Sequence, residues 1–96
     1  MRERLSPSDI SARLQELDGW ALEEGDTAIT KVFKFADFAE AMGFMTRCAI
    51  FADRIDHHPE WKNVYRMVEV RLSTHSAKGL TELDFKLAAF MDKASH

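Results

Sequence analysis

The sequence predicts an α+β protein in which helices cover one face of a four-stranded antiparallel sheet, in the order α-β-β-α-β-β-α. Three segments have apolar residues three or four positions apart and carry clear helix signals. Between them lie two pairs of segments with strand patterning and short connections, which favours antiparallel pairing. A sheet with one apolar face needs a layer of helices to bury it, so we expect a two-layer fold.

Length and composition are typical of a single small domain over residues 1–96. Apolar residues make up 46% and charged residues 30% of the chain, and the net charge is −3. This acidic balance argues against direct nucleic-acid binding, which favours a basic surface. No apolar run reaches about 18 residues, so we expect no membrane span. The single Cys48 excludes an internal disulfide, and the N-terminus lacks a signal-peptide pattern, so we expect a cytoplasmic protein.

Residues 6–19 predict the first helix. Ser6 can cap its N-terminus, Pro7 suits the first helical position, and Asp9 suits the positive end of the helix dipole. The apolar stripe of this helix is formed by Ile10, Leu14 and Leu17. Gly19 is the expected stop.

Residues 20–35 predict a short strand, a turn at Gly25 and Asp26, and a longer strand. Successive side chains of a strand point to opposite faces. One face of the longer strand therefore carries Ile29, Lys31, Phe33 and Phe35. The other face carries Thr30, Val32 and Lys34.

Residues 37–54 predict a second helix that is too apolar for one stripe. At 100° per residue its polar positions collect in one narrow strip, formed by Glu40, Gly43, Arg47 and Arg54. Most of the remaining circumference is apolar. We therefore expect this helix to bury one face on the sheet and another on a partner subunit. The alternative is that other helices of the same chain cover the second face.

Residues 61–72 predict the second strand pair, and residues 80–94 the last helix. Residues 61–65 form the expected first strand of this pair. In the next strand Val68, Val70 and Leu72 alternate with polar residues. Gly79 then breaks the chain, and Thr81 with Asp84 has the spacing of a capping box. The buried face of the last helix is expected to be formed by Leu83, Leu87, Phe90 and Met91.

Two adjacent histidines, His57 and His58, stand before Pro59 in the polar stretch DRIDHHPEW. A catalytic zinc site needs about three protein ligands that converge on one point. Adjacent residues of an extended chain point to opposite sides, and the helical His-x-x-x-His spacing is missing. Cys48 lies in an apolar helix without a ligand partner. We therefore expect no metal.

An acid–base site fits these residues better. The ordinary pKa of imidazole is about 6.5, so a histidine can give or take a proton at neutral pH. His57 and His58, pointing apart, could address two sides of a bound molecule, and Pro59 stiffens the backbone that carries them. His75 ends a strand, where site residues are common. The alternative is that each histidine is a surface or core residue.

Acidic and aromatic residues nearby could complete such a site. Asp53 and Asp56 lie close enough in sequence to orient an imidazole. Trp20 and Trp61 could supply flat apolar surface for an aromatic ligand. Both tryptophans could equally belong to the core, and Asp84 could be a helix cap or a ligand contact.

Several motifs together resemble the pterin-4a-carbinolamine dehydratase family. They are DHHPEWKNVY at 56–65, LSTH at 72–75, GLTELD at 79–84 and GW at 19–20. An acidic residue also stands four positions before His57. The combined spacing is far more specific than the HHP triplet alone, and the resemblance extends to the length and element order of the whole chain.

The resemblance implies roles for particular residues. Family members form their active site from the two histidines of HHP and the later histidine at a strand end, which correspond to His57, His58 and His75. The family's tryptophan after glycine corresponds to Trp20, and its aspartate in the GLT segment to Asp84. Asp53 stands where the animal enzymes usually have glutamate, one methylene longer. When the residues that flank HHP in sequence are included, the expected substrate-binding residues are Trp20, Asp53, Asp56, Trp61 and Asp84.

The family's reaction is the elimination of water from 4a-hydroxytetrahydropterin, which gives quinonoid dihydropterin and requires no metal or redox cofactor. The substrate arises when an aromatic amino acid hydroxylase uses tetrahydropterin and oxygen, so a functional link to such an enzyme is implied. Family members form dimers or tetramers, which would account for the apolar helix at 37–54. The sequence leaves open which histidine is the acid and which the base.

A second function is also implied by the resemblance. Some members bind proteins: one stabilises dimers of a homeodomain transcription factor, and related domains act in protein assembly. The intact histidine set favours the enzyme over a binding module that does not depend on catalysis.

Overall fold

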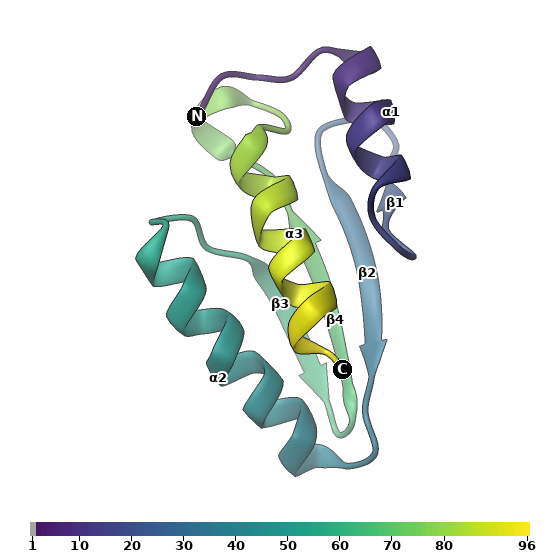
Figure 1. Ribbon diagram of the computed structural model, residues 1–96, viewed down its shortest axis with the longest axis vertical. Coiled ribbons are helices and arrows are strands. Elements are labelled where there is room, and N and C mark those ends of the chain that lie inside the picture. Colours follow the sequence, from purple (N-terminus) through teal and green to yellow (C-terminus); the bar gives the residue numbers. More distant parts are fainter. Residues whose placement is uncertain (1) are drawn as a thin grey trace.

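The computed structural model describes residues 2–96, and within them helices and strands follow the predicted order (Figure 1). The helices are α1 (Pro7–Gln15), α2 (Phe38–Arg54) and α3 (Glu82–Ala94). The strands are β1 (Ala21–Leu22), β2 (Ile29–Lys34), β3 (Glu60–Val64) and β4 (Met67–Leu72). A short 3₁₀ helix, η1 (His75–Ala77), which the sequence did not predict, follows β4. The predicted α+β fold class is confirmed.

Each helix begins where its capping residue predicts. The Ser6 side chain accepts a hydrogen bond from the Asp9 backbone at the start of α1, and Asp37 caps α2 in the same way. Both bonds of the predicted capping box between Thr81 and Asp84 are present at the start of α3. At the other end, α1 stops earlier than expected, so the predicted stop at Gly19 lies in the turn before β1.

The sheet has the strand order β1-β2-β4-β3, and all its pairs are antiparallel. The central pair runs from Ile29 opposite Leu72 to Lys34 opposite Met67. A tight turn at Tyr65, with a positive φ of 52°, joins β3 to β4. Gly25 and Asp26 both have positive φ, which confirms the predicted turn between β1 and β2. This register places the start of β3 beside the end of β4.

Helices α2 and α3 pack on one face of the sheet and lie in front of it in Figure 1. Phe44 of α2 meets Phe33 of β2 with ring centroids 4.8 Å apart. Phe51 of α2 stacks on Phe90 of α3 at 4.2 Å. The buried side chains of the sheet are Ile29, Phe33, Val68, Val70 and Leu72, which follow the predicted alternation.

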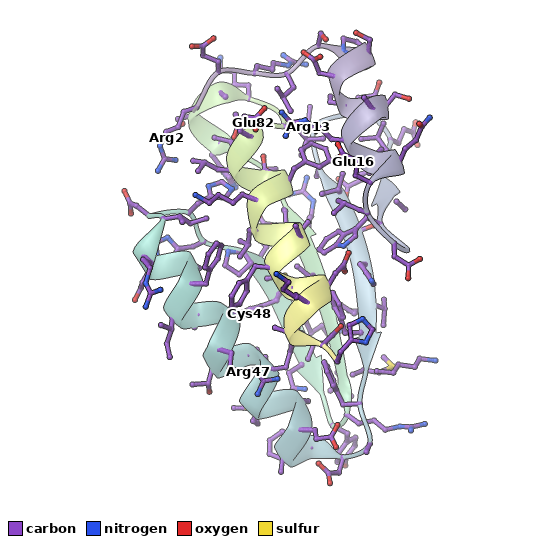
Figure 2. The ribbon with its side chains drawn as sticks, viewed as in Figure 1. Arg2, Arg13, Glu16, Arg47, Cys48 and Glu82 are labelled. Carbon is purple, nitrogen blue, oxygen red and sulfur yellow. The ribbon has the colours of Figure 1, made fainter. Side chains whose placement is uncertain are left out.

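The start of α3 is also tied to α1. The Arg13 guanidinium donates hydrogen bonds to both carboxylate oxygens of Glu82, and Figure 2 shows the two side chains reaching toward each other. Backbone pairing of Leu5 with Leu80, at 2.8 Å, holds the segment before α1 against the segment before α3. The N-terminus of α3 is thereby fixed from two sides.

Helix α2 buries one side and exposes another. Ala41, Phe44, Cys48 and Ala52 are buried against the sheet and α3. On the other side Phe38, Met42 and Ile50 are exposed by 53%, 42% and 56%. Within residues 2–96 no helix covers these three side chains, so the alternative of intramolecular coverage is wrong for them. None of the helices described in this range is long and apolar enough to span a membrane.

Cys48 provides a test of the packing of α2. Burial raises the pKa of its thiol to about 12, although the nearby Arg47 charge acts in the opposite direction. Because the thiolate is the nucleophile, we expect the native protein to resist alkylation by iodoacetamide at about pH 8. Protein unfolded in guanidinium chloride is the control and should be alkylated fully, as measured by mass spectrometry. Equal rates for the native and unfolded protein would contradict this packing.

Candidate active site

The buried polar side chains of residues 2–96 form one hydrogen-bonded group. These side chains are His57, Thr74, Thr81 and Asp84, with exposures of 5%, 2%, 0% and 0%. We call them the buried polar cluster. Buried polar groups are costly unless they are hydrogen-bonded. Four such groups come from three separate segments and form one hydrogen-bonded network. This network therefore marks a candidate functional site.

The centre of the buried polar cluster is the Asp84 carboxylate. Its Oδ1 lies 2.6 Å from Nε2 of His57. Its Oδ2 accepts a hydrogen bond from the Thr74 hydroxyl at 2.8 Å and another from the Thr81 backbone N–H at 3.0 Å. Asp84 is therefore the helix cap that the sequence predicted, and it also contacts a predicted catalytic histidine, while its contact with substrate stays a prediction.

A local backbone motif turns His57 toward α3. The His57 N–H donates to the Ala52 carbonyl at 3.0 Å, and the Asp56 N–H donates to the Asp53 carbonyl at 3.2 Å. Asp56 itself has a positive φ of 52°. This is the Schellman pattern that ends many helices, with Asp56 in the left-handed position that aspartate tolerates better than most residues. The chain reverses at the end of α2 and delivers His57 into the interior.

His58 lies on the opposite side of the chain from His57. Its side chain is exposed, and its Nε2 lies 2.8 Å from Oδ1 of Asp53, which is also exposed. The pair of adjacent histidines therefore divides into one buried and one exposed imidazole, as the alternation of an extended chain requires. Although Asp53 is shorter than the glutamate usual in the family's animal enzymes, it reaches His58.

His75 begins η1, separated by two residues from the end of β4, and is also exposed. Its Nε2 lies 3.1 Å from Oε1 of Glu60, and the Arg71 guanidinium donates to the other oxygen of Glu60 at 3.1 Å. Sequence analysis did not single out Glu60. The signal was present in its position directly after HHP and opposite Arg71 once β3 and β4 are paired.

Arg71 extends this exposed network across the sheet. It donates to both carboxylate oxygens of Glu23, and this hydrogen bonding lowers the pKa of Glu23 and raises the pKa of Arg71. Both groups are therefore charged across the physiological range. Glu60 is thus held by a permanent cation while it contacts His75.

The three predicted histidines lie around one end of the sheet. Glu60 at the start of β3 is paired in register with Arg71, near the end of β4. Thr74, in the buried polar cluster, directly precedes His75. Each histidine contacts a carboxylate through Nε2, and these partners are Asp84, Asp53 and Glu60. The fold therefore gathers three imidazole–carboxylate pairs, one buried and two exposed.

The remaining predicted substrate-binding residues lie at varying distances from this end. Trp20 is buried, and its indole N–H donates to Asp92 at 2.9 Å. Asp92 follows Asp84 by eight residues of α3, about 12 Å along the helix axis. The structure therefore does not bring Trp20 to the buried polar cluster within one chain, and its role in substrate binding stays a prediction.

Asp56 and Trp61 lie nearer to the histidines. The Asp56 carbonyl accepts a hydrogen bond from Arg2 at 2.5 Å, and its exposed carboxylate lies 3.6 Å from the same guanidinium. Trp61 is half-buried and packs against the core. It also lines a hollow of about 680 Å³ on the sheet, together with Glu60 and Arg71. Substrate contacts of Asp56 and Trp61 likewise stay predictions.

The side chains that could bind a metal ion are the next feature of this end of the sheet. Among residues 2–96, no three His, Cys, Asp or Glu side chains come together in a way that could hold a metal ion. The histidines instead pair singly with carboxylates. This arrangement suits proton transfer, because each carboxylate fixes one ring nitrogen and leaves the other for a bound molecule.

Comparison with known proteins identifies the family to which the chain is similar. The family model for pterin 4 alpha carbinolamine dehydratase matches residues 3–94. A protein of Rhizobium johnstonii, provisionally named a pterin-4-alpha-carbinolamine dehydratase, is 57% identical over 97% of this chain and 92% of its own length. A provisionally named dehydratase of Sinorhizobium fredii is 55% identical over 97% of this chain and 89% of its own.

Solved structures show the same fold. The crystal structure of a transcriptional coactivator/pterin dehydratase from Brucella melitensis superposes with a TM-score of 0.95 at 48% identity, covering 98% of this chain and 100% of that one. A pterin dehydratase-like RuBisCO assembly factor of the alpha-carboxysome has a TM-score of 0.71 at 20% identity, covering 81% and 90%, and shares the fold. With a family match along nearly its whole length and relatives more than half identical to it, the chain belongs to the pterin-4a-carbinolamine dehydratase family.

Proposed function

We propose that this protein removes water from a 4a-hydroxytetrahydropterin to give the quinonoid dihydropterin, by acid–base catalysis at His57, His58 and His75. The observation that carries the proposal is the buried contact of 2.6 Å between His57 and Asp84. A histidine held in the interior by a carboxylate is the arrangement that orients a catalytic imidazole. Membership of the dehydratase family supports the choice of substrate.

The reaction needs two proton movements. One proton is added to the 4a-hydroxyl, which leaves as water when its bond to carbon breaks. Another proton leaves the neighbouring ring nitrogen, whose electrons form the new double bond. Histidines can perform both steps, and the exposed His58 and His75 are placed to exchange protons with solvent. In this proposal Trp61, which follows Glu60 in β3 and is half-buried, supplies a flat apolar surface for the pterin ring.

The proposed setting follows from the substrate. A 4a-hydroxytetrahydropterin is made when an aromatic amino acid hydroxylase consumes tetrahydropterin and oxygen. We therefore propose that the protein returns the pterin to the pool that such a hydroxylase uses. We also propose that it does so in the cytoplasm, a reducing compartment that suits a chain with one cysteine.

Single replacements of the histidines test this function. We expect H57A, H58A and H75A each to slow the loss of the 4a-hydroxy species, and H57A by about 10²–10⁴-fold, which is the usual contribution of a general acid or base. The rate would be followed by absorbance with enzymatically generated substrate. His96 is an exposed histidine at the end of the chain, so H96A is the matched control and should retain full activity.

The alternative function is a protein-binding module that does not depend on catalysis. The exposed apolar stripe of α2, formed by Phe38, Met42 and Ile50, is the feature that favours it. The two functions differ in one simple result. If the wild-type protein fails to accelerate dehydration over buffer, or if none of the three histidine variants slows it, catalysis by this site is wrong and the binding module becomes the better reading.

We also propose that the exposed stripe of α2 mediates a homodimer or homotetramer. Phe38, Met42 and Ile50 recur along one side of a helix whose opposite side is already in the core. Burying these three side chains against a second copy would remove apolar surface from water at about 25 cal/mol per Å². No other copy is needed to complete the core of the single chain.

A charge placed in this stripe should break the assembly. We expect the wild-type protein to sediment as a dimer or tetramer in analytical ultracentrifugation and I50E to sediment as a monomer, because the new carboxylate would be buried without a partner. Val64 is exposed to a similar degree but lies at the end of β3, so V64E is the matched control and should leave the assembly intact. A monomeric wild-type protein, or an oligomeric I50E, would contradict this interface.

A further inference from the structure

We propose that Thr74 is a positioning residue, whose hydroxyl orients the Asp84 carboxylate and thereby fixes which nitrogen of His57 carries a proton. Thr74 lies directly before His75, and its side chain is buried rather than exposed. The proposal deepens the proposed function, on which it rests only for the chemistry that His57 performs. Its structural part, the proton position in the imidazole, holds independently of any substrate.

Donor and acceptor roles in the buried polar cluster follow from the number of hydrogens that each group carries. The Thr74 hydroxyl donates its single hydrogen to Oδ2 of Asp84 at 2.8 Å. Its contact of 2.8 Å with the Thr81 hydroxyl must therefore be one in which Thr74 accepts and Thr81 donates. The Thr81 oxygen in turn accepts from the Leu83 backbone N–H at 3.3 Å. Each donor in this chain has one hydrogen, so the order cannot be reversed.

These donor and acceptor roles determine which ring nitrogen of His57 carries hydrogen. The Asp84 carboxylate accepts on Oδ2 from the Thr74 hydroxyl and from a backbone N–H, and it accepts on Oδ1 from the imidazole. Nε2 of His57 is therefore the nitrogen that carries hydrogen. In the neutral ring Nδ1 then holds the lone pair. Nδ1 is the atom that would exchange a proton with a bound pterin.

Burial makes the Thr74 hydroxyl difficult to replace. Thr74 is 2% exposed and Asp84 is fully buried, so bulk water cannot take over a lost hydrogen bond without entering the core. Without this hydroxyl, Oδ2 of Asp84 would keep one donor, and the Thr81 hydroxyl would lose its acceptor. The carboxylate would then be free to turn, and the imidazole hydrogen would lose a fixed acceptor.

The backbone of Thr74 is fixed as firmly as its side chain. Its N–H donates to the Gly79 carbonyl at 2.9 Å, and its carbonyl accepts from the Gly79 N–H at 3.4 Å. This bridge closes the base of the loop that carries His75. One residue therefore joins the buried His57, through its side chain, to the exposed His75, through its backbone.

Two substitutions at position 74 separate the hydroxyl from the shape of the side chain. T74V keeps the volume and branching of threonine but removes the hydroxyl, whereas T74S keeps the hydroxyl. S8A is the control for loss of a hydroxyl, because Ser8 is an exposed residue of α1 whose hydroxyl contacts the Ser6 hydroxyl at 3.2 Å, away from the buried polar cluster and from the exposed stripe of α2. Nitrogen-15 NMR of the histidine side chains reports which ring nitrogen of His57 bears hydrogen, and steady-state kinetics reports kcat and KM.

We expect the wild-type protein, T74S and S8A to show hydrogen on Nε2 of neutral His57, and T74V to show a mixture of both tautomers. In T74V we expect kcat to fall by about 10–100-fold, the range found when an outer hydrogen-bond partner of a metal-bound histidine is lost. KM should change little, since Thr74 is buried and does not contact substrate. T74S should stay within about threefold of the wild type.

Three results would overturn the proposal: hydrogen on Nδ1 of neutral His57 in the wild-type protein, a T74V protein with the wild-type tautomer and kcat, or equal impairment of T74S and T74V. If T74V does not fold by circular dichroism, T74A replaces it in the comparison with T74S. Failure of the proposed function gives a different pattern. The NMR result would then stand as expected while the wild-type protein itself shows no dehydration.

Discussion

The rest of the structure depends on a single constraint, which is that the buried Asp84 carboxylate must be satisfied on both oxygens. A charge in the interior costs several kcal/mol unless hydrogen bonds compensate for it. Here the compensation comes from three segments: the start of α3, the stretch that follows β4, and the loop that ends α2. Because these segments belong to different parts of the fold, satisfying one carboxylate also fixes how the helices meet the sheet at the end where the histidines lie.

The three histidines have similar carboxylate partners but differ in burial. Each is held through Nε2 by a carboxylate, yet His57 is buried while His58 and His75 are largely exposed. The difference arises from backbone geometry. The Schellman motif at the end of α2 sends one of two adjacent side chains inward, and alternation sends the next outward. A fixed interior imidazole beside two solvated ones is a reasonable arrangement for moving protons between a bound ring and water.

Most of the fold could be predicted from the sequence because its signals are local. Capping residues such as Ser6 and Thr81 act within four residues of themselves. The alternation of apolar and polar residues in β4 predicts one buried face of the strand. The contacts of Asp84 with Thr74 and of His75 with Glu60 could not be predicted, since they depend on strand register and helix packing. The distance between Trp20 and His57 could not be predicted either. Trp20 contacts Asp92 and His57 contacts Asp84, so their separation depends on the spacing of these two aspartates along α3.

The capping box of α3 has a consequence for how the protein opens. Asp84, the third residue of this helix and part of its capping box, also contacts the interior imidazole, so fraying of the first turn and loss of the His57 contact are one event rather than two. Helix ends usually open at little cost, whereas a cooperative unit opens only when all its bonds break together. Because Asp84 serves both the helix end and the imidazole, we expect the contact with His57 to belong to the slow-exchanging part of the molecule.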